Sequence, residues 1–105
     1  MKLSVVIPCF NEVGTIGKVL TKVRECGIEP IEIVVVDDFS TDGTRELLSG
    51  PLQTKIDVLV LHSQNKGKGA ALHSGFKKCS GDVVVIQDAD LEYDPDDLKF
   101  LMQNK

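Results

Sequence analysis

Apolar and polar positions follow two different periods along the chain, and the alternation of these periods predicts strands and helices in regular succession. Short apolar runs rich in β-branched residues predict four strands, at residues 3–8, 31–36, 58–61 and 83–86. Apolar residues at helical spacing predict four helices, at residues 14–26, 44–48, 68–79 and 95–103. The third of these helices is expected to bury Ala71, Leu72, Gly75 and Phe76 on one side.

The second and fourth predicted strands are apolar throughout instead of alternating with polar residues. Strands of this kind are covered on both faces, which is typical of a parallel sheet between helices. The predicted fold class is therefore α/β, a Rossmann-like parallel sheet with helices on both faces, and residues 1–105 are expected to form one domain. In such sheets ligands bind at the edge formed by the carboxyl ends of the strands.

Composition narrows the range of functions. A net charge of -4 argues against a basic surface for nucleic acid or membrane. The three cysteines lack C-x-x-C spacing and are expected to be reduced thiols, and no apolar segment is long enough to span a membrane, so a cytoplasmic location is expected. His62 and His73 have no metal-ligand spacing and are assigned no role in a site.

Acidic side chains follow the fourth predicted strand at Asp88 and Asp90. Residues two apart in an extended segment point the same way, so the two carboxylates can share a hard divalent cation such as Mg²⁺ or Mn²⁺. The alternative is an acidic turn that caps the following helix. The position at the ligand edge of a buried strand favours the metal site.

A second acidic pair, Asp37-Asp38, ends the second predicted strand. Two adjacent carboxylates repel each other and need compensation. Hydrogen bonds from a ribose or a base would supply it, and so would lysine or backbone N–H groups of the protein. A purely structural role in shaping the turn before the next helix remains open.

The other two strand ends are less specific. Residues 66–69, Lys-Gly-Lys-Gly, precede a helix N-terminus, where Lys68 could reach a diphosphate, but a surface turn has the same pattern. Phe10 could stack on a base beside the carboxylate of Glu12, or could be part of the core.

These loops together resemble family 2 glycosyltransferases, in particular the branch of dolichyl-phosphate and polyprenyl-phosphate glycosyltransferases. The motifs that carry the resemblance are residues 5–12 (VVIPCFNE), 34–44 (VVVDDFSTDGT), 65–71 (NKGKGAA) and 82–95, which includes Asp88-Ala89-Asp90. Phe10 stands where many relatives have tyrosine, and Phe39 replaces the small residue usual after the aspartate pair.

The resemblance implies the N-terminal part of a GT-A fold that binds a UDP- or GDP-sugar with a divalent metal and, in the full-length enzyme, transfers the sugar with inversion to an acceptor such as a polyprenyl phosphate. Asp88 and Asp90 would then meet metal and diphosphate. The implied nucleotide-sugar contacts are Pro8, Phe10, Glu12, Val36, Asp38, Gln87, Asp88, Ala89 and Asp90, in addition to Lys68.

Family catalytic domains are longer, so the catalytic base and the acceptor site are expected beyond Lys105, and the 105-residue chain alone is expected to be inactive. The alternative is a binding module that lacks catalysis and self-associates to cover an exposed sheet edge. A sugar-1-phosphate nucleotidyltransferase is disfavoured because residues 11–14 do not form a Gly-rich triphosphate loop. A receiver domain is disfavoured because its acidic pair belongs on the first strand.

Overall fold

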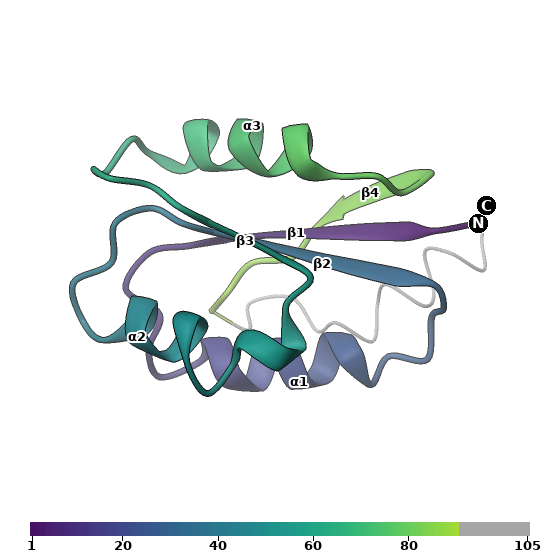
Figure 1. Ribbon diagram of the computed structural model, residues 1–105, viewed down its shortest axis with the longest axis horizontal. Coiled ribbons are helices and arrows are strands. Elements are labelled where there is room, and N and C mark those ends of the chain that lie inside the picture. Colours follow the sequence, from purple (N-terminus) through teal and green to yellow (C-terminus); the bar gives the residue numbers. More distant parts are fainter. Residues whose placement is uncertain (91–105) are drawn as a thin grey trace.

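The computed structural model describes residues 1–90 as a four-stranded parallel sheet between helices (Figure 1). The strands are β1 (Leu3–Cys9), β2 (Ile31–Asp37), β3 (Val58–Leu61) and β4 (Val83–Ile86). The helices are α1 (Ile16–Arg24), α2 (Thr44–Ser49), the 3₁₀ turn η1 (Gln53–Lys55) and α3 (Lys68–Lys78). The predicted α/β class is confirmed, whereas η1 was not predicted and the helix expected at 95–103 lies outside the described residues.

The strand order is β3-β2-β1-β4. The chain adds β2 and β3 on one side of β1 and then returns to place β4 on the other side. Because crossovers in parallel sheets share one handedness, this reversal puts α3 on the opposite face from α1 and α2 (Figure 1). The reversal also makes the carboxyl ends of β1 and β4 the switch point of the sheet, where ligands bind in folds of this class.

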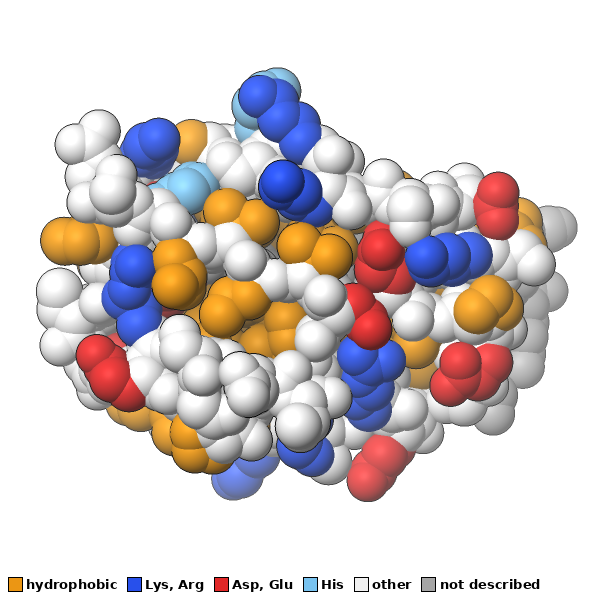
Figure 2. Space-filling view, in the orientation of Figure 1, with side chains coloured by type: hydrophobic (Ala, Val, Ile, Leu, Met, Phe, Trp, Pro, Cys, Tyr) orange, Lys and Arg blue, Asp and Glu red, His pale blue; other side chains and the backbone are white. Residues whose placement is uncertain are grey.

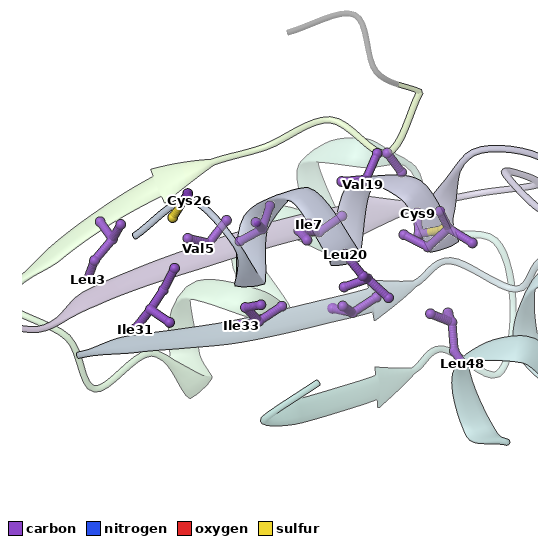
Figure 3. Packing of buried hydrophobic residues seen from close by; sticks show 14 residues of the cluster. Leu3, Val5, Ile7, Cys9, Val19, Leu20, Cys26, Ile31, Ile33 and Leu48 are labelled. Atoms are coloured by element: carbon purple, nitrogen blue, oxygen red, sulfur yellow. The ribbon is translucent and has the colours of Figure 1, made fainter. Parts of the chain in front are cut away.

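One face of the sheet and α1 form the main core. The parallel register pairs Leu3 with Ile31, Val5 with Ile33 and Ile7 with Val35, so that odd-numbered side chains of β1 and β2 share this face. Helix α1 covers them with apolar residues at the i, i+3, i+4, i+7 spacing of an amphipathic helix. These residues are Ile16, Val19, Leu20 and Val23, all fully buried (Figure 3).

Helix α3 covers the other face through a narrow contact. A Cβ atom added at Gly75 would lie 2.6 Å from Cγ1 of Val6 and 3.2 Å from Cγ2 of Val36, so the helix backbone lies directly on β1 and β2. Ala71 and Gly75 are buried, but Leu72 is only half-buried and Phe76 is exposed. The expectation that all four face the core was wrong for Phe76. Only Ala71 and Gly75 of α3 are buried against the sheet, and Phe76 lies outside this contact.

Strand β4 also differs from the prediction. Val84 and Ile86 are 42% and 47% exposed, whereas Val83 and Val85 pack against the core on the α1 side. The expected cover on both faces was wrong within the described residues, because β4 lies at the edge of the sheet beyond the reach of α3. The opposite edge of the sheet is formed by β3. Figure 2 shows the molecule from the β3 side, where hydrophobic side chains gather across the middle with charged side chains around them.

The edge of the sheet away from the strand carboxyl ends is closed by a buried acid. Glu32 accepts hydrogen bonds from Oγ of Ser4 at 2.8 Å and from both N and Oγ of Ser80 at 2.9 Å.

All three cysteines are free thiols. None of the helices within residues 1–90 has the length and apolarity needed to cross a bilayer.

Candidate functional site

A pocket of about 280 Å³ lies at the carboxyl ends of β1, β2 and β4, at the switch point of the sheet. The segments that follow the four strands and the start of α3 supply its walls. It is lined by Pro8, Cys9, Phe10, Glu12, Asp38, Asn65, Lys68, Ala71, Asp88, Ala89 and Asp90. The binding edge predicted from the order of strands and loops is therefore a concave site in the structure.

All but two of the residues expected to contact a nucleotide sugar line this pocket. The exceptions are Val36 and Gln87. Val36 is fully buried beneath α3, and Gln87 is 2% exposed with Nε2 3.2 Å from the carbonyl oxygen of Asp88. Both side chains lie in the layer behind the wall of the pocket, and their contact with a nucleotide sugar stays a prediction.

Hydrogen bonds between backbone N–H groups and side-chain oxygens join two loops and hold the first wall of the pocket. Asn11, whose φ is 53°, donates its N–H to Oγ of Ser40 at 2.8 Å and accepts from the N–H of Thr41 at the same distance. Glu12 donates its N–H to Oγ1 of Thr44 at 3.1 Å. Phe10 is 45% exposed and lines the pocket, so the alternative that it fills the core is excluded.

Adjacent aspartates at the end of β2 belong to separate networks. Asp37 is fully buried and accepts from N and Oγ of Ser40 at 3.0 and 2.6 Å and from Nη1 of Arg45 at 3.2 Å. Arg45 lies over the ring of Phe39, 5.6 Å from its centroid, and Phe39 has a φ of 70°. The protein itself compensates the charge of Asp37.

Asp38 points to the other side of β2 and lines the pocket. Its Oδ1 atom lies 2.9 Å from Nδ1 of His62 and accepts from the N–H of Lys66 at 2.8 Å, and its Oδ2 atom accepts from the N–H of Gly67 at 2.8 Å. Burial raises the pKa of this carboxyl, but the hydrogen bonds from His62, Lys66 and Gly67 outweigh burial, so the pKa lies below its usual range. Asp38 is therefore a carboxylate at neutral pH.

His62 is a residue of the site region that was not predicted from the sequence. The side chain is 6% exposed and lies between Asp38 and Ser74, whose Oγ atom is 2.8 Å from Nε2 of the ring. His62 has no metal-ligand spacing to other residues, but it directly follows β3, beside the acidic end of β2, and this position is the signal in the sequence that points to Asp38.

The two acids after β4 face the pocket on either side of a buried alanine. Ala89 is 3% exposed and packs into the core, and its carbonyl accepts from Oγ1 of Thr15 at 2.5 Å. Residues 89 and 90 form a turn after β4, and this turn brings both Asp88 and Asp90 to the lining of the pocket. Nζ of Lys68 lies 2.8 Å from Oδ1 of Asp88.

The carboxylate oxygens of Asp88 and Asp90 are suitable ligands for a magnesium or manganese ion that is also coordinated by a bound molecule. Residues 1–90 contain no group of three or more His, Cys, Asp or Glu side chains placed to hold a metal on their own. A hard cation bound through one or two carboxylates completes its shell with phosphate oxygens and water. The pair therefore suits a metal that arrives with a diphosphate.

Comparison with known proteins agrees with this geometry. Residues 4–104 match the model of glycosyl transferase family 2. A dolichol-phosphate mannosyltransferase of Pyrococcus furiosus is 39% identical over 98% of this chain and 30% of its own length. An undecaprenyl-phosphate 4-deoxy-4-formamido-L-arabinose transferase of Pectobacterium carotovorum is 37% identical over 96% of this chain and 32% of its own. The chain thus spans about a third of the length of these curated relatives.

Solved structures show the same architecture. TarS of S. aureus in complex with UDP-GlcNAc has a TM-score of 0.83 and 27% identity, over 98% of this chain and 30% of TarS. The mannosyltransferase PcManGT of Pyrobaculum calidifontis in complex with GDP-Man and Mn²⁺ has a TM-score of 0.76 and 33% identity, over 84% of this chain and 27% of PcManGT. With the sheet of a GT-A fold and a polar pocket at its switch point, the chain belongs to glycosyl transferase family 2.

Proposed function

We propose that residues 1–105 form the nucleotide-sugar-binding part of an inverting glycosyltransferase that takes a UDP- or GDP-sugar together with Mg²⁺ or Mn²⁺. The names of the relatives support a sugar donor of this kind, since TarS was solved with UDP-GlcNAc and PcManGT with GDP-Man and Mn²⁺. The observation that carries the proposal is the convergence of Asp38, Lys68, Asp88 and Asp90 on one pocket at the switch point of the sheet.

Each wall of the pocket suits one part of a nucleotide sugar. The exposed ring of Phe10 and the carboxylates of Glu12 and Asp38 lie together and suit a nucleoside, which offers a flat ring and N–H or hydroxyl donors. Asp88 and Asp90 would hold the cation, whose charge stabilises the leaving diphosphate when it is bound. Lys68 would exchange its contact with Asp88 for a diphosphate oxygen.

The four remaining predicted residues shape the pocket. Pro8 and Ala89 form parts of its lining, whereas Val36 and Gln87 support the lining from behind. We propose that Pro8 and Ala89 contact the ligand directly through their backbone and small apolar surfaces.

Calorimetry with UDP and GDP, each with and without Mn²⁺, tests the proposal. We expect metal-dependent binding of at least one nucleotide. Asp88→Asn and Asp90→Asn should each weaken it about 10-fold or more, because a metal ligand and a charge are lost. Glu25→Gln removes an exposed acid of the α1 end and serves as the matched control. Failure of a folded chain to bind either nucleotide would reject the proposal.

We propose a polyprenyl phosphate as the acceptor class of the whole protein, on the strength of the curated relatives that are named for such lipids. A phosphate acceptor is already ionised and needs little help from a general base. None of the described residues is assigned that role. A radiolabelled transfer assay with the 105-residue chain is expected to show no product.

A self-associating module without catalysis is the second candidate, and the exposed side chains of Val84 and Ile86 at the edge strand favour it. Light scattering at increasing concentration tests it. A dimer that Ile86→Lys dissociates would support self-association, and a monomer at every concentration would exclude it. For either candidate we infer a cytoplasmic location, which the free thiols of Cys9, Cys26 and Cys79 favour.

A further inference from the structure

His62 links the pocket to α3 through a buried ring. Its backbone N–H donates to the carbonyl of Asp37 at 2.9 Å, and its own carbonyl accepts from Nη1 of Arg45 at 2.7 Å. The backbone of this residue is therefore held to β2 and α2. Only the ring is left to reach across to Asp38 and Ser74.

The donors and acceptors around the ring define its state. Asp38 is a carboxylate and accepts hydrogen bonds only, so Nδ1 of His62 must carry the proton and donate to Oδ1. In the neutral ring Nε2 is then an acceptor, and the hydroxyl of Ser74 donates to it. Asp38 therefore selects one tautomer, and Ser74 matches it from α3.

These contacts fix the orientation of a carboxylate that lines the pocket. The backbone N–H groups of Lys66 and Gly67 hold Asp38 from the loop, and His62 holds it from β3. The loop contacts alone leave the carboxylate tied to a segment of exposed polar residues, whereas the ring ties it to the packed sheet and to α3.

We propose that His62 is a positioning residue that orients the Asp38 carboxylate toward the ligand in the pocket, with Ser74 as its anchor. The inference rests on the proposed function, because the ligand that Asp38 meets is taken to be the nucleoside of a nucleotide sugar. His62 itself does not line the pocket and acts through Asp38.

Coupling between the two residues in UDP and GDP binding tests the proposal. His62→Leu removes both ring contacts and should weaken binding of the preferred nucleotide with Mn²⁺ about 10-fold, since a hydrogen bond to a charged group is lost. In an Asp38→Asn background the same substitution should cause less than about a 2-fold change. Equal losses in both backgrounds would overturn the proposal, because a general effect on folding does not depend on Asp38.

Further variants separate positioning from stability. His62→Asn keeps an amide donor near Nδ1 and should recover most of the affinity even if its melting temperature stays low. Ser74→Ala should weaken binding about 2- to 5-fold through loss of the anchor. His73→Gln changes the other histidine, which is exposed on α3, and should leave binding unchanged. Affinities that follow the melting temperatures across the series would overturn the proposal.

A measurement on the unmodified chain does not need a ligand. Nitrogen NMR of the ring at pH 8 should show the proton of His62 on Nδ1, and Asp38→Asn should shift this tautomer population. A ring that carries its proton on Nε2 and none on Nδ1 would overturn the positioning contact. If the tautomer is as expected but UDP and GDP do not bind, the proposed function fails and the contact between His62 and Asp38 stands.

Discussion

Replacing Gly75 by alanine tests whether α3 lies as close to the sheet as the structure has it. The new Cβ atom would be 2.6 Å from Cγ1 of Val6 and 3.2 Å from Cγ2 of Val36, well inside the 3.5–4.0 Å of a normal carbon contact. Both valines are fully buried and stiff at χ1, so they cannot turn away. Overpacking of this severity costs about 2–3 kcal/mol, and the better helix propensity of alanine returns about 1 kcal/mol.

The net expected loss is therefore about 1–2 kcal/mol of unfolding free energy, measured by urea denaturation at 25 °C. A thermal scan should show a melting temperature lowered by about 4–8 °C for each kcal/mol. Gly69→Ala is the matched control in the same helix, because nothing lies within 4 Å of its new Cβ, and it should be neutral or stabilising. A Gly75→Ala chain as stable as the original would refute the close seating of α3.

Three further predictions concern charge and thiol chemistry. Lys68→Met should strengthen binding of Mn²⁺ alone by up to about 5-fold, because it removes the exposed ion pair between Lys68 and Asp88. The same substitution should weaken binding of UDP or GDP with Mn²⁺. Weaker binding of Mn²⁺ alone, measured by proton relaxation, would contradict this prediction. Burial raises the pKa of Glu32, but hydrogen bonds from Ser4 and Ser80 lower it by more than burial raises it, so the pKa in the folded state lies below 4.5. The contribution of Glu32 to stability is therefore full above about pH 4.5 and is lost as the pH falls through the lower pKa of the folded state. The stability difference between the original chain and Glu32→Gln should therefore shrink below pH 4.5, and a constant difference from pH 7 to pH 3 would contradict this. Burial raises the pKa of both the Cys9 and the Cys79 thiols, but Cys9 is only 2% exposed whereas Cys79 is half-buried, so a disulfide reagent at pH 8 should modify Cys79 well before Cys9. Equal rates in the folded chain would contradict the structure.

Most of the fold follows from local patterns in the sequence. The four strands and the first three helices were predicted within two residues at each end, because the change between strand and helix period is sharp and the connecting turns carry Gly, Pro or Asp. The wrong predictions concern the burial of side chains, which depends on the strands and helices packed beside them. Nothing local in Val84 or Ile86 distinguishes an edge strand from a central one, and Phe76 lies on a helical stripe that extends beyond the sheet contact.

The site was predicted as far as strand ends determine it. In a parallel sheet all strand carboxyl ends share one edge, and this rule alone brings Glu12, Asp38, Lys68 and Asp88 to one place. The depth of each residue was not predictable in the same way. Gln87 directly precedes Asp88 in the sequence but points behind the pocket wall, since adjacent residues of an extended segment face opposite sides.

The same rule explains the two aspartates at the end of β2. Asp37 has the parity of Ile33 and Val35 and faces the α1 and α2 side, where Arg45 meets it, whereas Asp38 faces the α3 side. The split of the pair could have been deduced from the sequence alone. His62 needs one fact more: Asp37 pairs with Leu61 across β2 and β3, so the next pair along the ladder is Asp38 and His62. The N–H of His62 donates to the carbonyl of Asp37 and continues that ladder. The histidine thus becomes recognisable as a partner of Asp38 once the strand order is known, and the contact is a property of sheet register instead of any sequence motif.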